Sequence, residues 1–304
     1  MVRALGILTG LGFVFVALWS FAWGFFAYVG AEHHETAEHR FHEHPRDFSF
    51  ATDGPFGEFD QQQLQRGFQV FREVCSGCHG LTYVSFRNLA EIGYEEEEIR
   101  AIAQQWPIQV PDVNAGTGEP ATRAALPADR FPNPYANEVA ARAANNNAMP
   151  PDLSLIVKAR HGGNDYIASL LTGYRRPPAD LPPDSRPGEG LHYNPYFPNL
   201  NLAMPPPLTG DGQVTYADGT RPTVEQMATD VAAFLTWTAE PNLQSRHRAG
   251  LAVTIFLLVA SILAWFAYKN VWASAKRAVR ITGPLDPQDI AKSDAAKRDA
   301  GIEG

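Results

Sequence analysis

The sequence predicts a mainly α-helical domain with long irregular loops, preceded by an N-terminal signal or anchor helix and followed by one C-terminal transmembrane helix. Three observations predict this class. Two long apolar segments lie near the ends of the 304 residues. Between them, apolar residues recur three and four positions apart in several short stretches, as on one face of a helix. Segments rich in Pro, Gly and Asn separate these stretches, so the loops are long.

The first apolar segment runs without a charge from Ala4 to Ala31, directly after Arg3. A basic start, an apolar stretch and the small residues Val29-Gly30-Ala31 are typical of a secretory signal peptide. The segment is longer than a usual signal core, so an uncleaved anchor is the alternative. Either interpretation predicts that the domain that follows is exported.

The second apolar segment covers residues 249–268 and contains no charged residue. At 1.5 Å per residue its 20 residues span about 30 Å, the thickness of the hydrocarbon core of a bilayer. Basic residues flank it on both sides, with more of them after it: Arg246, Arg248, Lys269, Lys276, Arg277 and Arg280. The positive bias after the segment places the C-terminus in the cytoplasm.

These patterns divide the chain into residues 1–31 (signal peptide or anchor), 32–57 (polar, histidine-rich linker), 58–245 (exported domain), 246–270 (transmembrane helix) and 271–304 (cytoplasmic tail). Residues 32–60 hold five of the nine histidines. They have no cysteine and no regular ligand spacing, so we expect no metal site there.

The charge of the exported part is strongly acidic. Residues 32–245 contain 28 acidic and 15 basic residues, whereas residues 269–304 contain seven basic and five acidic ones. An acidic body argues against binding to nucleic acid and suits a basic partner. Solubility alone is the other explanation of this charge.

Several stretches of the exported part predict helices. Residues 61–78 place Phe68, Phe71 and Val74 on one face, and Gly67 would let another helix approach closely. Residues 95–106 begin with four glutamates, which suit the positive end of a helix dipole. Shorter or interrupted helices are expected over residues 136–145 and over 153–171, where Gly162-Gly163 interrupts the pattern. Residues 107–134 and 174–222 read as loops.

Residues 223–239 predict an amphipathic helix. Thr223 is expected to cap it and Gln226 to complete a capping box. Met227 lies within this helix, where packing in the core is the favoured role.

The sequence CSGCH, residues 75–79, contains the only two cysteines, Cys75 and Cys78. A redox-active disulfide is disfavoured because a helix rather than a strand precedes the motif. Zinc needs about four ligands, and Cys75, Cys78 and His79 supply three. C-x-x-C-H is the attachment signal of a c-type haem, in which each thiol adds to a vinyl group and the histidine becomes an axial iron ligand. We therefore predict one haem c, covalent through Cys75 and Cys78, with His79 on the iron.

The residues alone leave more than one candidate for the sixth iron ligand. A methionine there would make an electron carrier of raised potential, and an open position would permit peroxidase-like chemistry. Met149 and Met204 both lie in loops before prolines and are equally good candidates. His161 and His192 are weaker ones.

Four stretches together resemble the cytochrome c1 family, the haem subunits of the quinol–cytochrome c reductase (cytochrome bc1) complex. They are RGFQVFREVCSGCH (66–79), AARAANNNAMPPDLSLIVKARHGGNDYIASLLTGY (140–174), YNPYFPNLNLAMPPPL (193–208) and DVAAFLTWTAEPN (230–242), which leads into the membrane segment. The resemblance covers about residues 58–275. It implies a class I cytochrome c-like haem domain over residues 58–245.

The resemblance also implies roles for particular residues. Met204, in AMPPPL, becomes the second iron ligand beside His79, and Met149 becomes pocket packing. The haem contacts that it implies are Asn145, Pro151, Arg160 and Tyr166. Arg160 is expected to pair with a haem propionate, because a guanidinium matches a carboxylate well.

The implied function is single-electron transfer from a Rieske iron–sulfur protein to a soluble or membrane-tethered cytochrome c during quinol oxidation. The chain alone is expected to catalyse nothing. Cytochrome b would anchor the C-terminal helix in a bacterial inner membrane, with the haem domain in the periplasm and the complex dimeric. A haem enzyme with an open sixth position and a carrier belonging to another membrane complex are the alternatives.

The chain departs from the family in two ways. It lacks the extra cysteine pair of some bacterial members, and its first 57 residues match the family poorly.

Overall fold

The computed structural model describes residues 2–30, 36–278, 287–299 and 301. Four residues used in the predictions lie outside the described residues: Ala31, His33, His34 and Arg280. The chain divides into two compact units, residues 1–49 with 61–239 and residues 50–60 with 240–304. The predicted mainly α-helical class is confirmed.

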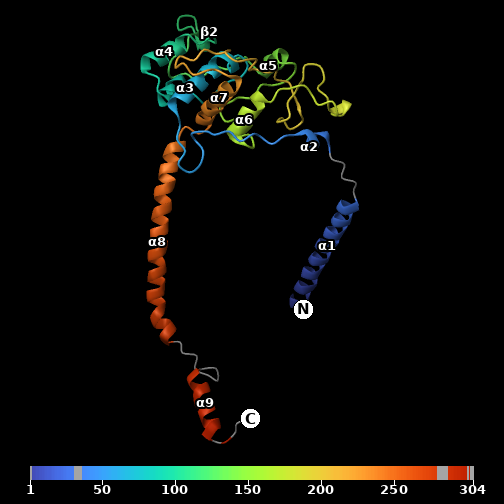
Figure 1. Cartoon of the computed structure of the whole chain (residues 1–304), viewed down its shortest axis with the longest axis vertical. Coiled ribbons are helices and arrows are strands. Elements are labelled where there is room, and N and C mark those ends of the chain that lie inside the picture. Colours follow the sequence, from blue (N-terminus) through green and yellow to red (C-terminus); the bar gives the residue numbers. More distant parts are fainter. Residues whose placement is uncertain (1, 31–35, 279–286, 300, 302–304) are drawn as a thin grey trace. The chain divides into compact units, whose positions relative to one another are not determined.

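Three helices build the centre of the first unit (Figure 1). Helices α3 (Gln61–Val70) and α6 (Gly163–Thr172) both pack against α7 (Val224–Ala239). The predicted close approach at Gly67 is confirmed, because a Cβ atom there would lie 2.0 Å from the Asp230 carbonyl oxygen and 2.7 Å from the Cβ of Phe234. Helix α3 therefore meets α7 backbone to backbone.

Aromatic side chains fill the space around this contact. Phe68 and Phe71 are buried and stack at an angle on Phe234, with ring centroids 5.6 and 5.7 Å from it. The ring of Phe131 lies 4.2 Å from that of Phe86, the first residue of the 3₁₀ helix η2 (Phe86–Ile92). Large buried rings contribute much of the hydrophobic free energy of a small core. This core fixes the end of α3 from which the CSGCH motif extends.

Two further predicted helices are confirmed, with ends shifted by a few residues. Helix α4 (Glu96–Gln104) begins at a capping box in which the Glu98 carboxylate accepts the backbone N–H of Glu95 at 2.8 Å. Helix α5 (Glu138–Ala144) is capped by Asn137, whose Oδ1 accepts the backbone N–H of Ala140 at 2.9 Å. Side-chain acceptors at a helix start satisfy N–H groups that have no partner inside the helix.

The predicted loop over residues 107–134 is partly wrong, because it contains an antiparallel hairpin of β1 (Val110–Val113) and β2 (Pro120–Arg123). Its turn is closed by the Asn114 side chain, which accepts the backbone N–H of Gly116 at 2.9 Å. Most of its residues are exposed, so the strands carry no alternation of apolar and polar residues. Without that alternation the sequence gives no strand signal.

The predicted helix over residues 153–171 is also partly wrong, since residues 153–162 form turns and α6 starts only at Gly163. Gly162 has φ +86°, a left-handed conformation that ends any helix arriving from its N-terminal side. Residues 174–222 are mostly irregular, as predicted. They contain the short 3₁₀ helix η3 (Pro183–Ser185) and the paired strands β3 (His192–Tyr193) and β4 (Asn201–Leu202).

The capping of α7 is confirmed only in part. The Thr223 hydroxyl accepts the backbone N–H of Gln226 at 3.1 Å, as expected of a cap. The predicted capping box is wrong, because the Gln226 side chain donates instead to the carboxylate of Asp230 at 2.9 Å. Asp230 is fully buried, and a buried carboxylate requires donors more strongly than an exposed helix end does.

Residues 36–49, here called the N-terminal segment, contain helix α2 (Ala37–Phe41) and then run extended. The segment belongs to the first unit and contacts α6 and the chain that follows α6. Its contacts are those of a docked segment, whereas the sequence predicted a polar linker.

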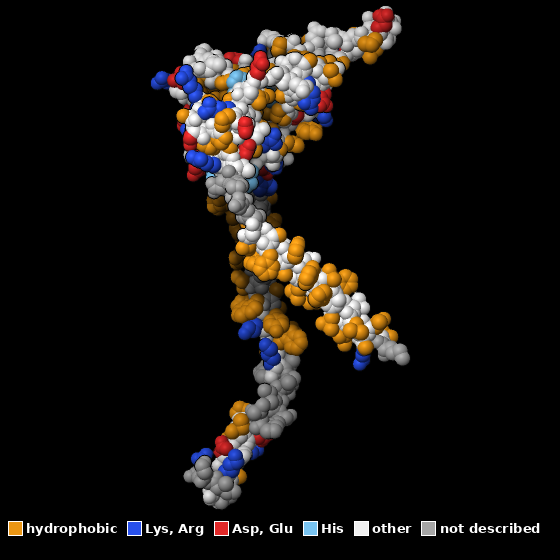
Figure 2. Space-filling model, turned by 90° about the vertical axis from the view of Figure 1, so that its right-hand side faces the viewer, with side chains coloured by type: hydrophobic (Ala, Val, Ile, Leu, Met, Phe, Trp, Pro, Cys, Tyr) orange, Lys and Arg blue, Asp and Glu red, His pale blue; other side chains and the backbone are white. Residues whose placement is uncertain are grey.

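In the described part of the chain, two helices are long and apolar enough to cross a membrane: α1 (Val2–Gly30), with mean hydropathy 2.0, and residues Leu243–Ala273, with mean hydropathy 2.4. The second span lies in α8 (Leu243–Ala278) and includes the predicted residues 246–270. Figure 2 shows apolar side chains, in orange, along both helices.

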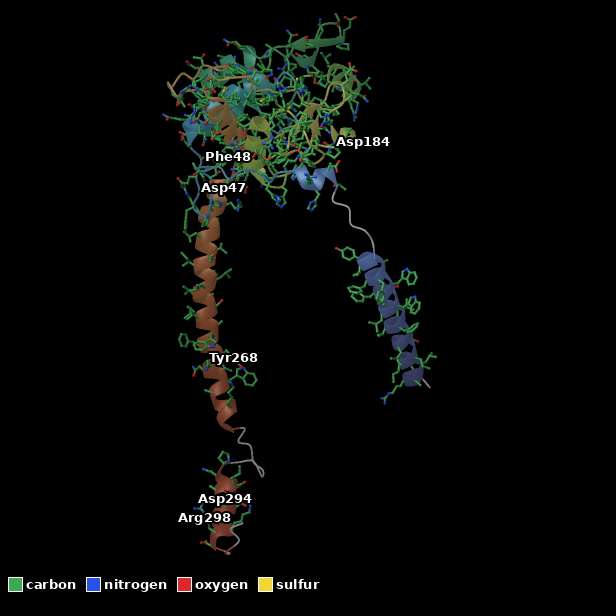
Figure 3. All side chains as sticks on the ribbon, turned by 45° about the vertical axis from the view of Figure 1, so that its right-hand side comes forward. Asp47, Phe48, Asp184, Tyr268, Asp294 and Arg298 are labelled. Carbon is green, nitrogen blue, oxygen red and sulfur yellow. The ribbon has the colours of Figure 1, made fainter. Side chains whose placement is uncertain are left out.

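Aromatic rings near the end of the α8 span lie beside lysines. Lys276 has its ammonium over the ring of Tyr268, which Figure 3 labels on α8, and Lys269 has its ammonium over the ring of Trp265. Such pairs are typical of a membrane–water interface.

Within the second unit, residues 50–60 lie against the start of α8. The His247 Nδ1 atom donates to the Gly57 carbonyl at 3.1 Å, and the Arg248 guanidinium donates to the Glu58 carboxylate at 2.9 Å. The unit ends with the polar helix α9 (Pro287–Asp299).

Candidate haem site

A wide helical turn leads into the motif. After α3 the chain continues as a π-helix, Phe71–Cys75, in which the Ser76 N–H donates to the Phe71 carbonyl five residues earlier at 2.8 Å. Such turns are rare and occur often at functional sites. The sequence predicted one continuous helix to Cys78, and nothing in its spacing distinguished this turn.

The two cysteines follow each other around a tight turn. The backbone N–H groups of Cys78 and His79 both donate to the Cys75 carbonyl, at 3.1 and 3.0 Å. Both thiols are free. Burial, and secondarily the neighbouring Cys78, raises the pKa of the Cys75 thiol to about 12. Redox-active C-x-x-C motifs depend on a lowered thiol pKa, so this environment does not suit a redox disulfide.

His79 is fixed by one hydrogen bond. Its Nδ1 atom lies 2.8 Å from the carbonyl oxygen of Pro151. A carbonyl can only accept, so Nδ1 carries the proton and Nε2 keeps its lone pair. Burial lowers the pKa of His79, although the Pro151 hydrogen bond and the charge of Asp152 oppose that shift. The side chain is therefore a neutral imidazole with a fixed tautomer, the form that binds a metal.

The Pro151 carbonyl is held in place by the chain on both sides of it. The Asp152 carboxylate accepts the backbone N–H groups of Thr82 and Ser154, both at 2.9 Å. The Leu153 N–H donates to the Gly80 carbonyl at 2.9 Å. These bonds tie residues 80–82 to residues 152–154, so the histidine and its acceptor move as one piece.

The candidate second ligands have different surroundings. The Met204 carbonyl accepts a hydrogen bond from the Tyr174 hydroxyl at 3.0 Å, and the Met204 side chain is half-buried. Met149 is 48% exposed. Met227 is fully buried on α7, which confirms its predicted role in the core. The role of Met204 as iron ligand stays a prediction.

The four other predicted haem contacts fall into separate groups. Pro151 is the partner of His79. Arg160 is exposed and interacts with the phenol of the buried Tyr166. The Asn145 side chain donates to the Ala141 carbonyl at 2.7 Å. Their roles toward a haem stay predictions.

Tyr135 was not predicted from the sequence. It interacts with the side chain of Asn145 and with the thiol of Cys78, so it connects one predicted haem contact to the motif. It stands in the loop sequence NPYAN, which carries no recognised pattern.

The donors suit a covalent haem and do not suit a bare metal ion. Two free thiols follow each other in one turn, and a neutral imidazole with a free Nε2 comes next. Among the residues that the structure describes, no group of three or more His, Cys, Asp or Glu side chains could hold a metal ion.

Comparison with known proteins decides the family. Residues 50–275 match the Cytochrome C1 family. This chain belongs to the cytochrome c1 family. Cytochrome c1 of Rhodospirillum rubrum is 45% identical over 246 residues, which cover 77% of this chain and 88% of that protein. The mitochondrial cytochrome c1 heme protein of Saccharomyces cerevisiae is 44% identical over 261 residues, covering 85% of this chain and 81% of that protein.

A third relative is longer. The "Cytochrome b/c1" of Bradyrhizobium diazoefficiens is 44% identical over 249 residues, which cover 75% of this chain but 35% of that protein. The chain therefore spans about a third of this relative. As a cytochrome c1 family member with two apolar helices, the protein is membrane-anchored.

Proposed function

We propose that this chain is the haem c electron carrier of the cytochrome bc1 complex, passing single electrons from the Rieske iron–sulfur protein to a cytochrome c during quinol oxidation. The haem is attached through Cys75 and Cys78. The observation that carries the proposal is the hydrogen bond from His79 to Pro151, because it leaves Nε2 ready to bind iron. Membership of the cytochrome c1 family supports the same conclusion.

The bound haem supplies a centre that accepts and releases one electron. The two thiols would attach the haem to the chain, and His79 Nε2 and the Met204 sulfur would bind its iron. A thioether ligand favours the reduced state and so raises the potential. The exposed guanidinium of Arg160 is suited to pair with a propionate, and Tyr166 beside it would line the pocket. Asn145 and Pro151 complete the contacts.

The partners follow from the family. Cytochrome b is the neighbour of the membrane helix, and the name of the Bradyrhizobium relative combines cytochrome b with c1. The complex is dimeric, and the chain catalyses nothing alone. The glutamates at residues 95–98 lie at the start of α4, where Glu98 caps the helix and Glu96 pairs with Arg100 at 2.9 Å.

The location follows from the flanking charges. The haem domain lies in the periplasm of a bacterium and the C-terminus in the cytoplasm, because the basic residues after the α8 span favour the cytoplasmic side. Bacterial relatives support this location. Residues 1–31 serve as export signal or anchor.

The first test is an absorption spectrum of the oxidised and reduced protein, purified in detergent. The wild type should show a six-coordinate c-type haem with the weak far-red band of methionine–iron ligation. Met204→Leu should remove the band and lower the midpoint potential. Met149→Leu is the matched control and should leave both unchanged. A Met204→Leu protein with the wild-type band would refute this assignment of the ligand.

The second test addresses the partners. Cytochrome b and a Rieske protein should co-purify with the tagged chain. Oxidase subunits in their place would assign the carrier to another complex. Ready binding of carbon monoxide by the reduced wild type would indicate an open sixth position and favour a haem enzyme.

A further inference from the structure

We infer that the N-terminal segment, residues 36–49, positions the loop that carries Met204 and thereby maintains methionine ligation. The inference rests on the proposed role of Met204. The segment lies before residue 50, where the match to the family model begins. Most of its contacts are with residues 165–200, shortly before Met204 in the chain.

The segment completes a small core beneath that loop. Leu181, Tyr193 and Leu200 form a buried cluster, each with 3% or less of its surface exposed. Ala37 and Phe41 of α2 pack against this cluster from outside. Three buried side chains make a small core for such a long irregular region, so the two added residues form a substantial part of it.

The cluster holds a strained residue. Leu200 has φ +64°, a left-handed conformation that is unusual for a residue other than glycine, and it is fully buried. Such a conformation persists only where its surroundings impose it. Hydrogen bonds from the Leu200 N–H to Phe197 and from the Asn194 N–H to Leu200, both 2.8 Å, close the turn. Only three residues separate Leu200 from Met204. Contacts that hold this turn in place therefore also restrict the position of Met204.

Polar contacts connect the same segment to Pro195 and to Arg175, the neighbour of Tyr174. The Glu43 N–H donates to the Pro195 carbonyl at 2.9 Å, and the Glu43 carboxylate pairs with Arg175. Arg175 follows Tyr174, whose hydroxyl holds the Met204 carbonyl. The segment thus contacts the neighbour of the donor, Tyr174, and also the loop that leads to the acceptor, Met204.

The rest of the segment is fastened to α6. The Arg46 N–H donates to the hydroxyl of the buried Ser169 at 2.8 Å, and the Phe48 N–H donates to the Asp165 carboxylate at 3.0 Å. Figure 3 labels Asp47 and Phe48 at this end. Because α6 packs on α7 in the main core, the segment joins the Met204 loop to the rigid part of the unit.

The test uses the full-length haem-loaded protein with Phe41→Ala. Phe41→Leu is the conservative variant, and His39→Ala is the matched control, an exposed residue of the same helix. Two quantities are measured: the far-red methionine band of the oxidised protein, and hydrogen–deuterium exchange of residues 193–204 compared with α3. Phe41→Ala should reduce the band and accelerate exchange in residues 193–204 by about tenfold, a local opening that leaves α3 protected. Phe41→Leu should retain most of the band and most of the protection of residues 193–204. His39→Ala should change neither the band nor the exchange rate.

The inference fails if Phe41→Ala only lowers the unfolding midpoint while the band and the exchange of residues 193–204 stay as in the wild type. Failure of the proposed function looks different, because Met204→Leu would then keep the band of the wild type. In that case the exchange measurement still decides whether the segment supports the loop, since it does not depend on the ligand.

Discussion

Arg66 of α3 and the fully buried Asp230 of α7 form a two-pronged ion pair, with Nε and Nη2 2.9 and 3.3 Å from the two carboxylate oxygens. The same guanidinium donates to Asp218 at 2.7 Å. Burial opposes the charge of Arg66, but hydrogen bonds to the two carboxylates raise its pKa above the usual range. The pair joins the helix that leads into CSGCH to the last helix of the haem domain.

Asp230→Ala should destabilise the haem domain by up to about 3–5 kcal/mol, because Arg66 loses its fully buried partner and keeps only the partly exposed Asp218. Chemical denaturation followed by far-ultraviolet circular dichroism measures this. Asp218→Ala is the matched control, because Asp218 is 29% exposed and water can replace it beside Arg66. An equal loss of stability in the two variants would contradict the prediction that Asp230 contributes more than Asp218.

Gly67→Ala should be costly because the added methyl would meet the Asp230 backbone and Phe234. Overpacking of this kind costs about 1–3 kcal/mol, and the upper end is expected where backbone must move. Gly77→Ala is the control inside the motif, where a Cβ would have no neighbour within 4 Å. Thermal unfolding of both proteins compares them. A Gly67→Ala protein as stable as the wild type would mean that α3 and α7 can separate without loss.

Removal of the cysteines tests the attachment of the haem. Cys75→Ala and Cys78→Ala should each leave one thioether, so haem stain should remain on the chain in a denaturing gel. The double variant should lose the stain, because His79 alone gives a bond that denaturation breaks. Gly77→Ala should stain like the wild type. Stain that persists in the double variant would place the attachment elsewhere.

Asp129 should make the stability depend on acid pH. Its hydrogen bond with Arg123 lowers its pKa below the ordinary value of 3.8, although burial acts in the opposite direction. A carboxylate with a lowered folded-state pKa stabilises the fold above its unfolded pKa, and this contribution is lost as pH falls through the folded pKa. Asp129→Asn should therefore weaken the decline in stability below about pH 4.

Urea unfolding between pH 7 and pH 3 measures this dependence. Asp184→Asn, an exposed carboxylate of η3 (Figure 3), serves as the control and should keep the wild-type profile. If Asp129→Asn and the wild type lose stability in parallel on acidification, the pair with Arg123 is not responsible.

The sequence predicted those features that depend on neighbours along the chain. The spacing of Phe68 and Phe71 and the small residue Gly67 are local features, and the structure agrees with both. The C-x-x-C-H pattern is local as well, and membership of the cytochrome c1 family supports the haem c that it predicts. The capping box at Gln226 failed because a residue four positions later, Asp230, is buried and competes for the same side chain. That burial depends on α3, which is distant in sequence.

The N-terminal segment shows the same limit. Its polar residues are typical of a linker, and the partners of Glu43 and Arg46 lie more than 120 residues away. The hairpin of β1 and β2 was missed for another reason, because its exposed strands carry no apolar alternation. Tyr135 belongs to no pattern and is identified only by its place beside Cys78 and Asn145.

The π-helix before the motif sets the direction in which the thiols point. An α-helix turns about 100° per residue, so one extra residue held in a wide turn rotates everything after it by about that angle. Phe68 and Phe71 therefore still point into the core, whereas Cys75 points in a different direction around the helix axis. Deletion of one residue between Phe71 and Cys75 would then leave Phe68 and Phe71 in the core but rotate both sulfur atoms by about 100°. The direction of the two thiols therefore depends on the number of residues in this turn, which a substitution does not change.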